Sequence, residues 1–287
     1  MLMKMNYKKR VYAHLAEYKR NALEITDSGA WRGVEYSHIL PHSKREQNIL
    51  KSVQANFWEF AKSARSGSKP LVYSLHQFFH HLNSSQAMCF NLFYPFLTNL
   101  SNPNILAATL AESAVETVAE AIFEHVEDEA EGTNFDFFLR FQSGRKWFFE
   151  CKYTEEEFGR AKNDERHRAK LKEIYTEKLE GKVSPEAVDE STFFANYQLL
   201  RNISHVIPKN GDRLFVIFPR GNSNIYSPLN RKVDIIKTLL LPKTLECVSV
   251  LRLEDLVNRF KQSPLQNKVE IKTHWQLFEE KYLPPLE

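Results

Sequence analysis

Apolar and polar side chains alternate with a period of two in two neighbouring runs near the middle of the chain, residues 134–141 and 146–153. This period is typical of β-strands, whose successive side chains point to opposite faces. One face of the pair is mostly aromatic and comprises Phe135, Phe137, Leu139, Phe141, Trp147, Phe149, Cys151 and Tyr153. The other face is polar and comprises Asp136, Arg140, Lys146, Glu150 and Lys152. Two acids and a lysine therefore lie on the polar side of a predicted β-hairpin.

The length of the hairpin loop decides whether the two acids meet. A loop of two or four residues would place Asp136 opposite Cys151, with the acids on opposite faces. A loop with an odd number of residues, or a bulge at Gly144, instead places Asp136 opposite Glu150 or Lys152. We predict the odd arrangement, because it also sends four aromatic side chains of the hairpin into one core: Phe135, Phe137, Trp147 and Phe149.

Apolar residues that recur at helical spacing predict helices elsewhere in the chain. The predicted helices cover residues 7–25, 46–64, 105–122, part of 155–179 and a segment that begins at Ser191. A continuous apolar run at 213–219 is typical of a buried strand, and a later strand at 246–253 precedes a helix at 254–261. This order of elements predicts an α/β fold, a three-layer core with a mixed central sheet flanked by helices.

The first hundred residues contain no catalytic pattern. We predict that residues 1–84 form an N-terminal helical extension and that residues 85–287 form the core, with its C-terminal strand and helix. Aromatic and basic residues of the first helix have the chemistry to contact DNA, and they also suit the core and the solvated face of an amphipathic helix. They are Tyr12, Tyr18, Lys19 and Arg20.

Composition limits the class of protein. A chain of 287 residues that is 43% hydrophobic can bury a substantial core. No stretch is apolar enough to span a bilayer, and no apolar segment of a secretory signal follows the basic start. Three scattered cysteines, Cys89, Cys151 and Cys247, lack the spacing of a zinc site, which is typical of a reducing cytoplasm. Nine glycines and no phosphate-binding loop argue against an ATP-driven activity.

The polar face of the hairpin carries the strongest chemical signal. Two carboxylates held close together can bind a divalent cation through oxygen ligands. A nearby ammonium group can orient a water molecule or neutralise a phosphate. Asp136, Glu150 and Lys152 therefore predict a site that cuts phosphodiester bonds.

The spacing of these residues resembles a known signature. Asp136, a gap of thirteen residues and then Glu150-x-Lys152 are similar to the PD-(D/E)XK motif of restriction-endonuclease-like nucleases. The proline of the older form of the motif is absent, since Asn134 and Phe135 precede the aspartate. The run from 133 to 161 further resembles uncharacterised bacterial members of that superfamily, and the likeness covers roughly residues 85–220.

The resemblance implies a restriction-endonuclease-like core and a metal-assisted hydrolysis. Asp136, Glu150 and the backbone carbonyl of Cys151 would bind Mg²⁺, with Mn²⁺ as a substitute. Lys152 would hold the attacking water beside the phosphorus and stabilise negative charge there. The cation would also relieve the repulsion between two acids held close together.

Further site residues are implied by the helices around the hairpin. In the superfamily an acid from the preceding helix often completes the metal site, and Glu116 is our choice from an acidic stripe that also contains Glu112 and Glu120. A solvent-facing stripe is the alternative for all three. Gln198 and Arg201 resemble polar residues that follow the Glu-x-Lys strand, where they would reach the metal-bound water and a substrate phosphate. Surface positions on an amphipathic helix are their alternative.

A basic segment follows the hairpin. Net charge is only +3, but positive side chains crowd this segment and comprise Arg160, Lys162, Arg166, Arg168, Lys170 and Lys172. Interspersed acids make a solvated helix face one interpretation, and a surface that contacts phosphates is the other. The neighbouring hairpin favours the second, with Arg160, Lys162 and Arg166 as nucleic-acid contacts.

Together these features predict a Mg²⁺-dependent endonuclease that hydrolyses DNA, with RNA as a second candidate substrate. The alternative is a catalytically inactive module of the same fold that binds nucleic acid or protein, because fold does not determine function. The intact Asp136, Glu150 and Lys152 favour the enzyme. A restriction role would require a homodimer to cut both strands, whereas a repair or defence nuclease would act as a monomer.

Overall fold

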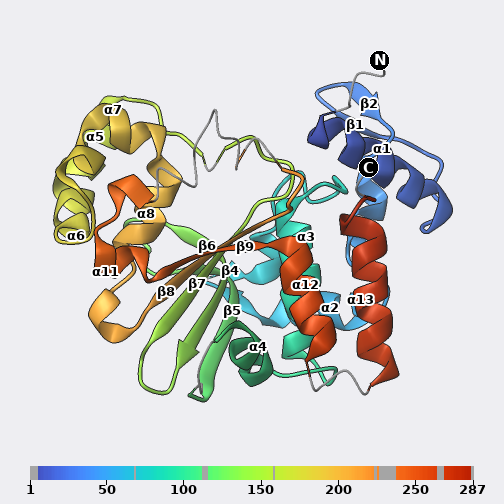
Figure 1. Ribbon diagram of the computed structural model, residues 1–287. Coiled ribbons are helices and arrows are strands. Elements are labelled where there is room, and N and C mark those ends of the chain that lie inside the picture. The colour runs from blue at the N-terminus through green and yellow to red at the C-terminus, as the bar shows by residue number, and fades with distance from the viewer. Residues whose placement is uncertain are drawn as a thin grey trace.

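A five-stranded sheet lies at the centre of the computed structural model (Figure 1). The structure describes residues 6–67, 69–111, 116–157, 159–222, 225, 237–263 and 268–285. The strands follow the order β5 Val118–Val126, β6 Asn134–Phe141, β7 Lys146–Cys151, β8 Arg213–Phe218 and β9 Val248–Arg252. β5, β6 and β7 pair antiparallel, whereas β7, β8 and β9 pair parallel. The mixed central sheet is therefore confirmed.

Helices cover both faces of the sheet, as expected for a three-layer core (Figure 1). One face packs against α2 Gln54–Ser63, α3 Ser85–Phe93, α4 Pro103–Leu110, α12 Leu253–Gln262 and α13 Val269–Tyr282. The other packs against α6 Thr176–Leu179, α7 Glu190–Ala195, α8 Tyr197–Ser204 and α11 Pro242–Leu245, and α5 Glu165–Lys170 precedes these helices in the chain. A π-helical turn, Leu171–Tyr175, joins α5 to α6. The fold class is that of a restriction-endonuclease-like core.

The N-terminal segment contains short hairpins as well as helices. Its elements are α1 Tyr7–Asn21, β1 Gly29–Trp31, β2 Val34–Tyr36, the 3-10 helix His42–Asn48, α2, β3 Arg65–Ser66, β4 Lys69–Pro70 and the 3-10 helix Leu71–Tyr73. Val11 and Phe57 of this segment share one hydrophobic cluster with Phe137 of the sheet. The boundary between residues 84 and 85 stays a prediction; Ser84 caps α3, accepting a hydrogen bond from the Ala87 N–H at 3.2 Å.

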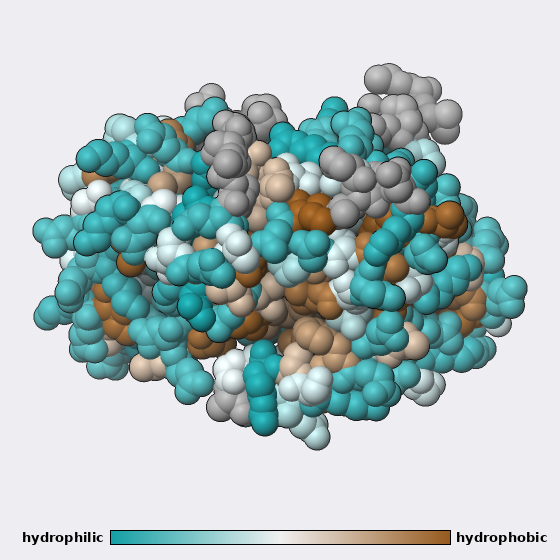
Figure 2. Space-filling view, turned by 90° about the horizontal axis from the view of Figure 1, so that it is seen from below, coloured by the Kyte–Doolittle hydropathy of each residue, from teal (hydrophilic) through white to brown (hydrophobic). Residues whose placement is uncertain are grey.

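The surface seen in Figure 2 is mostly hydrophilic. Among the described residues, no helix is both long enough and apolar enough to cross a bilayer. Hydrophilic side chains cover most of this face, which is seen from below, with apolar patches between them (Figure 2).

Further 3-10 helices of the core are Tyr94–Leu97, Pro185–Val188 and Pro208–Asn210.

The hairpin has the register that we predicted. The Phe141 N–H donates to the Arg145 carbonyl, which leaves a three-residue loop of 142–144. Gly144 has a φ of 87°, a left-handed conformation that glycine adopts at little cost. Phe137 pairs with Phe149, so the same register places Asp136 across from Glu150.

The prediction of one shared aromatic core was wrong for Phe135. Phe137, Trp147 and Phe149 join the cluster that faces α3, but Phe135 packs on the opposite face against Phe148, with ring centroids 4.4 Å apart. In the partner strand, Phe123 and His125 are likewise split between the two faces. Glu124, between them, has a φ of 52°. This left-handed residue breaks the alternation, and both strands change faces beside Asp136.

The helix predicted at 105–122 was also wrong. Among the described residues of this stretch, α4, Pro103–Leu110, is the helical part, and Val118–Val126 is a strand. Pairing of β5 with β6 along their length outweighs the local helical spacing of the acids. Glu112 lies outside the described residues. The helix predicted at 46–64 is shorter, since residues 42–48 form a 3-10 helix and α2 begins at Gln54.

A buried asparagine connects the N-terminal segment to the core. Asn91 on α3 is fully buried, and its side-chain oxygen accepts a hydrogen bond from the Leu50 N–H at 2.8 Å. Its amide donates to the Asn48 carbonyl at 2.9 Å and to the Tyr282 hydroxyl on α13 at 2.8 Å. One side chain therefore holds three separate segments together.

Replacing Asn91 by alanine should destabilise the fold by about 2–4 kcal/mol, because the buried Leu50 N–H and its neighbours lose their partner. Urea unfolding followed by circular dichroism measures this change. Asn21→Ala, at the exposed end of α1, is the matched control and should change stability by less than about 0.5 kcal/mol. Equal effects of the two substitutions would contradict the role of Asn91.

Candidate active site

The structure brings together the three residues of the hairpin signature. The Lys152 amine lies 2.8 Å from Glu150 Oε1. The N–H of Cys151, between them in sequence, donates to Asp136 Oδ2 at 2.6 Å. Because this hydrogen bond crosses from β7 to β6, it holds the aspartate carboxylate against the Glu-x-Lys segment.

Two amides on α8 hold the Glu150 carboxylate. Gln198 Nε2 donates to Glu150 Oε1 at 2.7 Å, and Asn202 Nδ2 donates to Oε2 at 3.0 Å. The Lys152 amine also donates to Gln198 Oε1 at 3.0 Å. Gln198 therefore lies where we predicted, beside the signature. Asn202 was missed, although its spacing of four residues from Gln198 puts both on one helix face.

Gly159 leaves room for Gln198. It has a φ of 110°, and a Cβ at this position would lie 2.7 Å from Gln198 Oε1. Its carbonyl accepts a hydrogen bond from the Gln198 N–H at 3.2 Å. The backbone between β7 and α5 thus fits closely around the side chain that positions Glu150 and Lys152.

A third acid, Glu124, lies beside Asp136 in place of the predicted Glu116. The flanking pairs Phe123–Phe137 and His125–Phe135 bracket Glu124 and Asp136. Glu124 is 5% exposed, accepts a hydrogen bond from Asn134 Nδ2 at 2.5 Å and lines the same cavity as Asp136. We missed it because the sequence places it in an acidic run after a predicted helix.

The structure does not bring Glu116 to this site. Glu116 accepts a hydrogen bond from Ser143 Oγ at 2.8 Å and pairs with Arg145 at 3.2 Å, both in the hairpin turn. The turn lies at the opposite end of β6 from Asp136. Since β5 begins at Val118, Glu116 precedes the strand, and Glu120 pairs with Arg140 in the β5–β6 register.

Burial and repulsion dominate the electrostatics of the acids. Burial raises the pKa of the Asp136 carboxyl well above its usual range, and the charges of Glu150 and Glu124 add to the increase. Burial also raises the pKa of Glu124 to about 7, against hydrogen bonds from Gln86 and Asn134. Burial acts to lower the pKa of Lys152, but neighbouring carboxylates, Glu150 foremost, outweigh it and the pKa is raised. The lysine is therefore a fixed positive charge.

The donor chemistry suits a hard divalent cation. Asp136, Glu150 and the carbonyl of Cys151 offer oxygen ligands, which Mg²⁺ prefers. A cation would relieve the repulsion that raises the pKa of Asp136. Within the described residues, no group of three or more His, Cys, Asp or Glu side chains is arranged to hold a metal by itself.

The Cys151 thiol points away from the site. It lies in the cluster that faces α3, is fully buried beside Cys89, and burial raises the pKa of both thiols. An unreactive packed thiol, as alternation predicts, fits this environment.

The predicted nucleic-acid contacts are scattered. Arg201 on α8 donates from Nε to Glu131 Oε1 at 3.2 Å and to Thr133 Oγ1 at 3.0 Å, so its charge is used within the fold. Arg160 is exposed and pairs with Glu157 at 2.7 Å. Lys162 and Arg166, before and within α5, are exposed to solvent.

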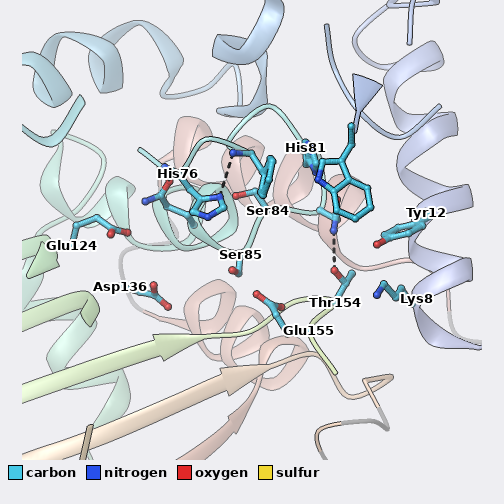
Figure 3. Close-up of a pocket in the computed structure, with 14 residues that line it drawn as sticks. Lys8, Tyr12, His76, His81, Ser84, Ser85, Glu124, Asp136, Thr154 and Glu155 are labelled. Carbon is cyan, nitrogen blue, oxygen red and sulfur yellow. Dashed lines mark hydrogen bonds between the residues drawn. The ribbon is translucent and has the colours of Figure 1, made fainter. Parts of the chain in front are cut away.

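A cavity of about 630 Å³ opens beside the acids (Figure 3). Glu124 and Asp136 lie at one end of it, and Lys8 and Tyr12 of α1 lie at the other. Glu155 and Ser85 lie between the two ends. Asp136 and Glu124 are therefore open to a ligand of substantial size.

Glu124 should make the metal-free protein less stable at high pH. The pKa of the Glu124 carboxyl is near 4.5 in the unfolded chain and about 7 in the folded protein. Its favourable contribution to the free energy of unfolding is therefore fully present below pH 4.5 and is lost as the pH rises through 7. Glu124→Gln should therefore stabilise the protein in EDTA by about 2 kcal/mol at pH 8 and change it little at pH 5. Urea unfolding at both pH values measures this difference. Glu116→Gln, at a carboxylate outside the cavity, is the control, and an equal gain of Glu124→Gln at both pH values would refute the assignment.

Comparison with known proteins adds the family. The family model described as restriction endonuclease associating with ARP matches residues 12–283. No curated protein and no solved structure matches the chain. The match covers most of the sequence, including the hairpin and α8. The chain belongs to the family of restriction endonucleases associating with ARP.

Proposed function

We propose that this protein is a Mg²⁺-dependent nuclease that hydrolyses phosphodiester bonds of DNA. The observation that carries the proposal is the position of the Lys152 amine. Glu150 and Gln198 hold it at 2.8 and 3.0 Å, and Asp136 is tied to the adjacent Cys151 N–H. Membership of a restriction endonuclease family supports the same chemistry.

Each side chain has a separate role in the proposed hydrolysis. Asp136, Glu150 and the Cys151 carbonyl would hold the cation, which when bound supplies a Lewis acid and a template for the phosphate. Lys152 donates hydrogen bonds to the attacking water and to a phosphate oxygen, because its raised pKa keeps it protonated. Glu124 takes the place of Glu116 in the proposed set. With a pKa of about 7, it can exchange a proton near neutral pH.

The exposed Arg160, Lys162 and Arg166 are the proposed contacts to the DNA backbone, where a positive charge gains affinity by releasing counterions. Arg201 has a supporting role instead, since it ties α8 to the β5–β6 connection. The family description names an association with ARP. We propose that this chain also associates with such a partner.

Alanine substitution of Asp136 or Lys152 should lower the rate of plasmid nicking at least about 100-fold, because the first removes a ligand of the cation and the second removes a positive charge beside the transition state. Supercoiled plasmid, linear duplex, single-stranded DNA and RNA are incubated with Mg²⁺, Mn²⁺ or EDTA. Glu116→Ala is the control and should retain the wild-type rate. Wild-type cleavage by Lys152→Ala would rule out the proposed role of the lysine. Metal-independent DNA binding without cleavage would favour an inactive binding module.

Gln198 should act as a positioning residue, because it contacts both Glu150 and Lys152. Gln198→Ala should lower kcat about 10–100-fold and raise the Mg²⁺ concentration for half-maximal rate. Gln142→Ala, in the exposed hairpin loop, should change neither quantity. A loss of activity with an unchanged Mg²⁺ dependence would show that Gln198 does not act through Glu150.

A further inference from the structure

The cavity beside the acids leads into an aromatic side pocket. A volume of about 190 Å³ is enclosed between α1, the β1–β2 hairpin and the segment before α3. Five residues line both this pocket and the larger cavity: Tyr12, Trp31, Phe78, His81 and Asn83. The pocket is thus continuous with the space that contains Asp136 and Glu124.

The walls of the pocket suit a flat ring. Trp31 and Phe78 meet edge to face, with centroids 6.3 Å apart at 90°, and His81 lies 5.1 Å from Phe78. All three are partly exposed. Aromatic side chains that keep an open face bind nucleobases by stacking, and every base has such a face.

The pocket also contains polar atoms without partners. Asn83 Nδ2 donates to Thr154 Oγ1 at 2.9 Å, which orients the amide (Figure 3). Within the described part of the chain, Asn83 Oδ1 and His81 Nε2 are buried and make no hydrogen bond. Buried polar groups are almost always paired, so each of these atoms would gain from a ligand with a complementary group. An amide oxygen accepts hydrogen bonds, as from the exocyclic amine of adenine, cytosine or guanine.

The position of Thr154 relates the pocket to the acids. Thr154 follows Lys152 by two residues, and two residues of chain span at most about 7 Å. A base attached next to a phosphate at Lys152 can therefore reach Asn83. A base that stays stacked and paired inside a duplex cannot enter the pocket.

We propose that this side pocket binds one unpaired nucleobase of the substrate, next to the phosphate that is cut. The substrate is then single-stranded DNA or a nucleotide turned out of a duplex, and a base with an exocyclic amine is preferred over thymine. The inference rests on the proposed nuclease function only for the position of the phosphate.

Fluorescence anisotropy in EDTA tests the pocket with labelled DNA. The probes are a single strand, a paired duplex and duplexes with one unpaired adenine or thymine. Wild type should bind the unpaired adenine about 10-fold more tightly than the paired duplex, and Trp31→Ala or Phe78→Ala should each remove this gain. Trp31→Phe should retain most of it. Tyr73→Ala, an exposed aromatic outside the pocket, is the control.

Each result decides part of the proposal. Asn83→Ala should abolish the preference for adenine over thymine. If Trp31→Ala weakens binding to the paired duplex as well, the base pocket is supported, and the base that it binds belongs to a nucleotide flipped out of the duplex. If Trp31→Ala and Phe78→Ala bind every probe as wild type does, the pocket is refuted.

Cleavage with Mg²⁺, assayed in parallel, separates the two proposals. Binding that depends on Trp31 without any cleavage would reject the nuclease function alone. Cleavage that is unchanged in Trp31→Ala would reject the base pocket alone. Thermal unfolding of each variant confirms that it is folded before its affinity is compared.

Discussion

The pairing register of the β6–β7 hairpin is the constraint on which the site depends. Because side chains alternate along a strand, a loop one residue longer or shorter would send Asp136 and Glu150 to opposite faces. The left-handed Gly144 allows the three-residue turn. The same register lets the Cys151 N–H reach Asp136, so backbone and side-chain contacts support one arrangement.

The burial of charge explains why α8 presents amide side chains to the sheet. Glu150 is 2% exposed, and an unpaired carboxylate at such a position would be costly. Gln198, Asn202 and Lys152 offset that cost with three hydrogen bonds. Asp136 and Glu124 have fewer donors, and burial together with their neighbours' charges raises the pKa of each. The acids nearest the cavity are thus the least satisfied.

Local patterns in the sequence were enough to predict the hairpin, its register, and the positions of Asp136, Glu150 and Lys152. The resemblance to the nuclease superfamily placed Gln198. The same reasoning failed for Glu116 and Glu124, because acids that recur every four residues mimic a helix while long-range pairing with β6 makes the segment a strand. The face change at Glu124 depends on one backbone angle, which alternation cannot reveal. Asn202 becomes recognisable only when its partner is known.

The backbone at Glu124 constrains how this protein can change. A φ of 52° is uncomfortable for glutamate and easy for glycine. Glycine there would relax the chain but would delete an acid from the cavity. Selection for stability therefore favours glycine at this position, whereas selection for activity favours glutamate. Such a conflict is common where activity needs a strained residue.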